Sequence, residues 1–288
     1  MVQLIASGLA MGCVYGLVGL SFILVYNATG ALNFAQGELV MLGAFLAAWL
    51  VGIQGIPYLG MVALTLLMMV GVGYLYQRIG YYPLRDKPFL AFVIATIGLS
   101  IFLRNLALII WGPDPKKMPS FFQTQVIAVA GAALTPENLF IIAVTIGVLT
   151  LQYLLFFHTR LGRKLRATAQ NQEVARLMGI SVGRTIALTF VMSTLLAGLA
   201  GILVAPIFLV DVDMGINLIF KAFIAVVIGG FGSVPGAVVG GLIIGLLEIF
   251  LAVYVSSVYK DALAFATLIV FLFIFPRGIF GEAVAEKV

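Results

Sequence analysis

The chain has 288 residues, of which 63% are hydrophobic and only 9% charged, and its mean hydropathy is +1.19. Soluble domains carry roughly 25% charged residues, and a soluble core of this length could not bury so much apolar surface, so we predict an integral membrane protein surrounded by membrane lipid. The net charge of +5 comes from basic residues gathered in two loops, as membrane orientation requires. It does not indicate a nucleic-acid partner.

Apolar runs that approach or exceed the length of a spanning helix, about 20 residues, recur along the whole chain. They predict an all-α, polytopic membrane bundle with about eight or nine transmembrane segments. The expected spans are residues 4–26, 39–53, 58–77, 89–111, 139–157, 186–209, 237–255 and 262–275. Residues 218–231 are apolar but short, and they form either a further crossing or a re-entrant half-helix.

A polar interruption, residues 27–38 (NATGALNFAQGE), separates the first two spans. Gly30 and Gly37 permit unusual backbone angles, and Asn33 and Gln36 can satisfy freed backbone groups or contact a passing solute. Non-helical backbone at membrane depth is tolerated only where protein or a water cavity surrounds it. The segment is therefore either a break near a translocation path or a plain cytoplasmic loop.

Ionisable residues inside apolar segments are expensive in lipid and usually face the interior of a bundle. This chain has four at or within its expected spans: Glu38, Arg104, Lys221 and Glu248. For Arg104 and Lys221 we favour a structural role, either in ion pairs between helices or with the charged end of the side chain reaching the membrane interface. Glu38 and Glu248, together with Asn33 and Gln36, are candidates for a polar path in which carboxylates meet the ammonium group of a zwitterionic solute.

Glycines recur at four-residue spacing in the first span and near the eighth. Such rows let helices approach closely, so we assign them to helix packing rather than to a site. The residues concerned are Gly8, Gly12, Gly16, Gly236, Gly240, Gly241 and Gly245.

Residues 158–184 form a basic segment between two apolar runs, and six of the sixteen Lys and Arg residues lie there. A short basic loop in a multi-span protein belongs on the cytoplasmic side. With this loop inside, the basic loop 78–88 also falls inside, whereas the N-terminus and the acidic loop 210–217 fall outside.

The second half of the basic segment predicts a short helix from about residue 169 to residue 178, stopped by Gly179. Val174, Leu177 and Met178 share one face of it at helical spacing. An apolar ridge of this kind fits a groove on another protein. The alternative is an amphipathic loop helix that lies on the membrane surface.

Several kinds of chemistry have no support in the sequence. There is no GxxxxGK[ST] nucleotide-binding loop, and His158 is the only histidine, so no Cys/His metal cluster can form. No nucleophile–histidine–acid set can be built. We expect neither an enzyme nor a bound cofactor.

The Glu-x-Ala-x3-Gly pattern of Glu173, Ala175 and Gly179 resembles the EAA loop of ABC importer permeases. Three stretches, 29–45, 164–180 and 221–248, look like the corresponding blocks of branched-chain amino acid permeases of the LivH type. The resemblance covers nearly the whole chain. Ribose-type sugar permeases are more distant relatives that share the general pattern.

The resemblance implies a single permease domain, residues 1–288, whose cytoplasmic coupling loop (about 158–184) docks on an ATPase. Its coupling residues would be Arg166, Glu173, Ala175, Leu177, Met178 and Gly179. The implied partners are a second related permease subunit, two ABC ATPase subunits that hydrolyse the ATP, and a periplasmic or extracytoplasmic solute-binding protein. The implied substrate is a branched-chain or related hydrophobic amino acid, and the implied location is the bacterial cytoplasmic (inner) membrane.

Three other functions stay open on the sequence. A urea or short-amide permease belongs to the same family. A stand-alone channel or secondary transporter, and a membrane scaffold or receptor, would have no use for a coupling loop.

Overall fold

The computed structural model describes residues 1–53, 56–122, 127–129 and 132–281. Within them, six helices are long and apolar enough to cross a membrane: α1 (Val2–Thr29), α3 (Tyr58–Tyr76, continued by short turns η1, Gln77–Tyr81, and η2, Tyr82–Leu84), α4 (Phe89–Trp111), α5 (Pro136–His158), α8 (Val182–Val204) and α10 (Val234–Tyr254). Three shorter apolar helices accompany them: α2 (Gln36–Val51), α9 (Met214–Gly229) and α11 (Lys260–Ile274). The predicted all-α, polytopic bundle is confirmed.

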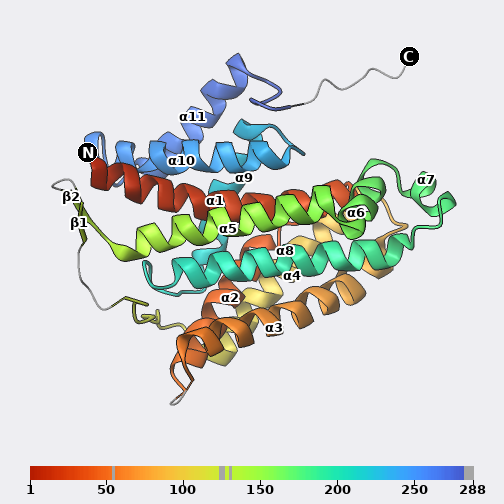
Figure 1. Ribbon diagram of the computed structural model, residues 1–288, viewed down its shortest axis with the longest axis horizontal. Coiled ribbons are helices and arrows are strands. Elements are labelled where there is room, and N and C mark those ends of the chain that lie inside the picture. Colours follow the sequence, from red (N-terminus) through yellow and green to blue (C-terminus); the bar gives the residue numbers. More distant parts are fainter. Residues whose placement is uncertain (54–55, 123–126, 130–131, 282–288) are drawn as a thin grey trace.

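Of the long helices, α5, α8 and α10 pack against α1, whereas α3 packs on α8 and α2, and α4 lies beside α2 (Figure 1). α1 is buried along nearly its whole length, whereas α3, α4 and α5 leave most of their apolar surface exposed. Helices that are hydrophobic all round belong in a protein interior or in lipid. α1 is therefore the core of the bundle, and α3, α4 and α5 form its outer wall.

α1 and α10 pack at very short range because glycines line their contact. A Cβ atom added to Gly12 would lie 2.7 Å from the Cα atom of Leu242, and one added to Gly8 would lie 3.0 Å from the Cα atom of Leu246. The glycines of α10 face α1 or α9. Gly241 and Gly245 meet Gly12 on α1, whereas Gly240 meets Ala225 and Gly236 meets Gly229 on α9. Side chains at these positions would separate the helices.

The interruption after α1 is shorter than the sequence suggested. Gly30, with φ 70°, ends α1, and its N–H donates to the Tyr26 carbonyl at 2.7 Å. α2 already begins at Gln36, so only residues 30–35 are non-helical. The prediction that Gly37 supplies an unusual backbone angle is wrong, because Gly37 is helical.

Two further boundaries differ from the predicted ones. The span expected to reach residue 209 ends at Val204, since Pro206 offers no backbone N–H and disfavours helix in the residue before it. The basic segment is not a loop with one helix but two consecutive helices, α6 (Arg160–Gln170) and α7 (Gln172–Leu177).

Before α5, the short strands β1 (Ile127–Val129) and β2 (Ala132–Leu134) pair in antiparallel orientation.

Candidate functional site

The helices α6 and α7 lie at one end of the bundle: α6 packs beside the ends of α1, α5 and α8, and α7 projects beyond them (Figure 1). The Thr159 Oγ1 atom accepts from the Gly162 N–H at 3.0 Å and caps α6. Asn171 separates the two helices. Its side-chain oxygen caps α7 by accepting hydrogen bonds from the Glu173 and Val174 N–H groups at 2.9 and 3.1 Å. α7 thus starts at Gln172, not near residue 169, because Asn171 is the preferred kind of N-cap residue.

The C-terminal end of α7 is also determined by residues next to it in the sequence. Gly179 has φ 76°, its N–H donates to the Arg176 carbonyl at 3.1 Å, and the Ile180 N–H donates to the Ala175 carbonyl at 3.0 Å. These two bonds form the Schellman arrangement that ends a helix at a left-handed glycine. Both ends of α7 are therefore fixed by its own residues.

α7 presents an apolar surface away from the bundle, which we name the α7 ridge: Val174, Leu177 and Met178. Leu177 is 87% exposed and Met178 is 77% exposed, while Ala175 on the opposite side is buried. Two large apolar side chains so exposed, next to charged neighbours, are unusual on a polar segment. Exposed apolar patches rimmed by polar residues mark sites of interaction with proteins or membranes.

The α6–α7 segment is attached to the core of the bundle. The Gln172 Nε2 atom donates to the Ala28 carbonyl near the end of α1, at 2.8 Å. The Arg166 guanidinium lies 4.8 Å from the centre of the Phe157 ring on α5. A displacement of α7 would therefore be transmitted to the most buried helix of the bundle.

A second feature lies where α2 and α9 begin. Each has 16 residues and is about 24 Å long, shorter than a hydrocarbon core of about 30 Å. Their first turns meet, because a Cβ atom added to Gly215 would lie 2.6 Å from the Gly37 carbonyl oxygen. From there α2 runs beside α3 and α8, and α9 runs beside α10. Two positive helix ends thus face one place in the bundle.

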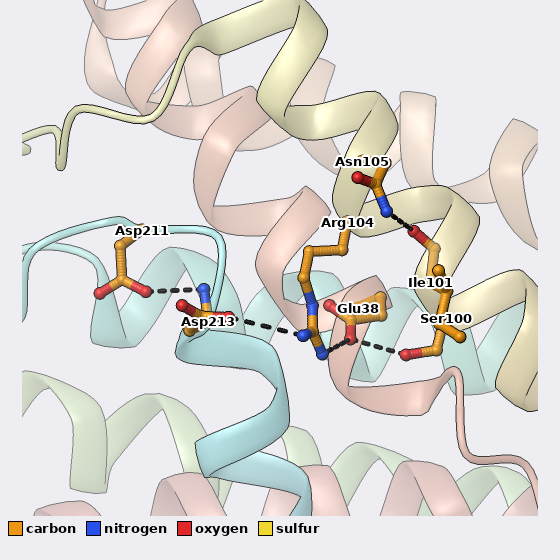
Figure 2. Close-up of polar contacts among 7 residues, drawn as sticks. All are labelled: Glu38, Ser100, Ile101, Arg104, Asn105, Asp211 and Asp213. Carbon is orange, nitrogen blue, oxygen red and sulfur yellow. Dashed lines mark hydrogen bonds and ion pairs between the residues drawn. The ribbon is translucent and has the colours of Figure 1, made fainter.

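Polar side chains from α2, from α4 and from the residue before α9 converge at this place, shown in Figure 2. We name it the α2–α9 junction: Glu38, Ser100, Arg104 and Asp213. The Glu38 Oε1 atom accepts from the Ser100 hydroxyl at 2.8 Å and from the Arg104 Nη2 atom at 3.2 Å. The Arg104 Nη1 atom lies 3.6 Å from the Asp213 Oδ1 atom. Arg104 therefore joins carboxylates from the beginnings of both short helices. Of the two structural roles expected for Arg104, the structure shows the interhelical ion pair.

The junction also has unused hydrogen-bonding capacity. Glu38 is 1% exposed, yet its Oε2 atom and the Arg104 Nε atom have no partner among the described residues. Buried polar atoms are nearly always paired. An acceptor and a donor left free in one buried place can receive a ligand that carries both kinds of group.

The other two polar candidates of the interruption have a different environment. Asn33 and Gln36 are buried and bond to each other at 2.9 Å. The Gln36 Nε2 atom also donates to Ser21 at 2.8 Å and to Ser193 at 3.0 Å, and the Asn33 Oδ1 atom accepts from the Tyr76 hydroxyl at 2.5 Å. This amide network ties the interruption to α1, α3 and α8. The other members of the network are Ser21, Tyr76 and Ser193. The only sign of them in the sequence is that each is a polar residue inside an apolar span.

Glu248 belongs to a separate ionic cluster. Its carboxylate accepts from the Tyr15 hydroxyl and from the Lys221 Nζ atom, both at 2.5 Å, and lies 3.2 Å from the Lys260 Nζ atom. Lys221 also pairs with Asp261 at 3.1 Å. Of the two structural roles expected for Lys221, the structure again shows the interhelical ion pair. The four polar candidates thus fall into three environments, and only Glu38 lies at the α2–α9 junction.

Comparison with known proteins identifies the class. The chain matches the family described as "Branched-chain amino acid transport system / permease component" over residues 4–272, and it belongs to that family. It is 34% identical to the high-affinity branched-chain amino acid transport system permease protein LivH of Salmonella typhimurium, over 99% of this chain and 97% of that protein. It is also 34% identical to the permease protein BraD of Pseudomonas aeruginosa, with the same coverage of both chains.

More distant similarities extend the same pattern. The ribose import permease protein RbsC of Escherichia coli is 27% identical, over 84% of this chain and 75% of that protein. The solved structure of PsaBC from Streptococcus pneumoniae in complex with Fab is 16% identical with a TM-score of 0.50, covering 94% of this chain and 90% of that one, and shares its fold. The chain is a multi-pass membrane protein of a transport permease family.

Proposed function

We propose that residues 1–288 form the permease domain of an ABC importer that moves branched-chain or related hydrophobic amino acids across the bacterial cytoplasmic (inner) membrane. Two relatives named for branched-chain amino acid transport, each aligned over nearly the full length of both chains, support the substrate class. The exposed α7 ridge is the observation that carries the ATP-driven part of the proposal.

The segment from about residue 158 to 184 would act as the coupling loop. A short, capped helix with an exposed apolar ridge suits insertion into a groove on a partner, and here the partner would be one of two ABC ATPase subunits. Glu173 and Gly179 flank the ridge, Ala175 holds α7 against the bundle, and Arg166 anchors α6. ATP binding and hydrolysis in the ATPases would move α7, and the Gln172–Ala28 hydrogen bond would pass the motion to α1.

The α2–α9 junction is the best candidate for a point on the translocation path. Discontinuous helices whose N-termini meet inside the membrane recur at the substrate sites of transporters. The free Glu38 Oε2 atom suits the ammonium group of an amino acid, and the Arg104 guanidinium suits its carboxylate. Asn33 and Gln36 would brace the interruption beside the path, and Glu248 would hold α10 to α9 and α11.

The remaining partners complete the importer. A periplasmic or extracytoplasmic solute-binding protein would deliver the substrate from outside, and a second related permease would supply the other half of the pathway. The exposed apolar surfaces of α3, α4 and α5 leave room for such a subunit as well as for lipid.

Substrate-stimulated ATP hydrolysis tests the substrate class. The permease, its ATPases and its binding protein are reconstituted together, and ATP hydrolysis is measured with leucine and with urea. We expect stimulation by leucine alone. Stimulation by urea and not by leucine would assign the chain to the short-amide branch, and uptake without ATP would indicate a channel or secondary transporter.

A further inference from the structure

A cavity of about 520 Å³ lies between α1, α5, α6 and α10, at the end of the bundle that carries α6 and α7. Its walls are apolar side chains from all four helices, among them Leu20, Leu149, Phe156, Leu165 and Val238. Cavities of roughly 300–1,000 Å³ hold a ligand of moderate size. Three of these helices, α1, α5 and α10, are apolar, so an acyl chain that enters between them from the bilayer meets apolar walls.

The side chains with polar atoms in the lining are Asn27, Gln152, Tyr153, Arg166 and Thr189. Asn27 donates to the Gly232 carbonyl at 2.9 Å and Thr189 to the Thr185 carbonyl at 3.1 Å, so we consider Gln152 on α5 and Arg166 on α6 as contacts for a ligand. Gln152 is 8% exposed, and neither atom of its amide has a partner in the described part of the chain. A buried amide without a partner is unfavourable. A ligand that offers a hydrogen-bonding group here would relieve that cost.

The charged residue of the lining and the other charged residues of α6 have one sign. Arg166 pairs with no carboxylate of the described residues, and α6 contributes three further exposed cations, Arg160, Arg163 and Lys164, and no acid. The Arg166 guanidinium carbon lies 4.8 Å from the centre of the Phe157 ring. This position leaves its N–H groups available to an anion.

We propose that the cavity binds one anionic phospholipid, with its phosphate at Arg166, its ester region within reach of Gln152 and one acyl chain along the apolar walls. The apolar lining excludes a free inorganic anion as the occupant, and the cations favour an anionic over a zwitterionic headgroup. Basic pockets between spans on the cytoplasmic side are where such headgroups bind. The site is independent of the α2–α9 junction and of the transported solute.

The test measures lipid retention by native mass spectrometry of the delipidated, detergent-purified chain. The protein is titrated with phosphatidylglycerol and with phosphatidylcholine of identical acyl chains. We expect about tenfold tighter binding of phosphatidylglycerol, the equivalent of one favourable charge contact. Arg166→Gln should remove most of that preference, whereas Arg163→Gln, on the same helix but outside the lining, should leave it unchanged.

A second pair of variants tests the acyl-chain part. Leu149→Trp fills the cavity and should abolish tight retention of either lipid, and Leu151→Trp, on the outer face of the same helix, should not. Gln152→Leu keeps the side-chain volume and should weaken the binding of both lipids by a similar factor. This variant tests the site even where the tryptophan variant fails to fold. Equal losses in the Arg166 and Arg163 variants, or unchanged retention in Leu149→Trp, would overturn the proposal. Equally tight binding of glycerol 3-phosphate would also overturn it, because that result requires no acyl chain.

Discussion

Replacing Gly37 by alanine should push α2 away from α9 at the point where their first turns meet. The added Cβ atom would lie 2.8 Å from the Gly215 carbonyl carbon and 3.0 Å from the Ile219 Cβ atom. Both obstacles are fixed to the α9 backbone, so no side-chain rotation relieves the overlap. Carbon atoms prefer separations of about 3.5–4.0 Å, and the two helices must therefore separate by roughly 0.5–1 Å.

The expected cost follows from that displacement. Overpacking a well-packed interior costs about 1–3 kcal/mol, and a chain of this size loses about 2–4 °C of melting temperature per kcal/mol. The same movement would separate Glu38 on α2 from Asp213 at the start of α9, the two carboxylates that Arg104 joins. Leucine uptake should therefore fall together with stability.

The assay compares Gly37→Ala with Gly98→Ala by thermal unfolding in detergent and by leucine uptake into proteoliposomes. Gly98 is helical in α4, and a Cβ atom there would meet no atom of the described residues within 4 Å. The control should keep its melting temperature or raise it, since alanine favours helix by about 1 kcal/mol over glycine. If both variants behave alike, the close approach of α2 and α9 is not a feature of the folded protein.

Three further substitutions test the polar clusters. Glu38→Gln keeps a partner for Ser100 but removes the charge facing Arg104, so leucine uptake should fall about tenfold, or about 1.4 kcal/mol; unchanged uptake would remove Glu38 from the path. Glu248→Ala leaves Lys221 without its buried carboxylate and should lower the free energy of unfolding by about 3–5 kcal/mol. Adding Lys221→Ala should recover part of this loss, and a melting temperature of Glu248→Ala equal to that of the wild type would contradict the prediction. Gln36→Leu deletes hydrogen bonds to α1 and α8 and should lower stability by about 1–3 kcal/mol, measured by the same melt; a neutral result would show that the amide network is dispensable.

Local signals in the sequence predict the elements of this fold well. The expected span 89–111 coincides with α4 residue for residue, because apolar residues fill it and proline and glycine flank it. Gly179 was expected to end a helix, and it ends α7 with a positive φ. The predicted boundary at residue 209 is wrong because Pro206, a local signal, ends α8 at Val204. α6 was overlooked because its charge indicated a loop, although the buried Gly162, Leu165 and Thr168 follow a helical period.

Contacts between distant residues could not be predicted in the same way. The sequence singles out Glu38 and Arg104 as costly charges, but nothing in it pairs them across 66 positions. Likewise, Gly37 was interpreted through its backbone freedom, whereas its lack of a side chain serves the contact with Gly215. Periodicity and capping describe one element at a time, while these contacts depend on how the helices pack.

Docking of the α7 ridge on the ATPase is the central claim, and one substitution tests it directly. Leu177→Asp places a charge where a leucine would be buried in a partner, which forfeits about 1.5–3 kcal/mol of apolar burial and adds the cost of desolvating the charge. Gln170→Asp adds the same charge to the exposed end of α6. Co-purification of the ATPase subunits and leucine-stimulated ATP hydrolysis are then compared in membranes that express equal amounts of each variant. The account predicts loss of both in Leu177→Asp and retention of both in Gln170→Asp; intact, leucine-stimulated complexes carrying Leu177→Asp would contradict it.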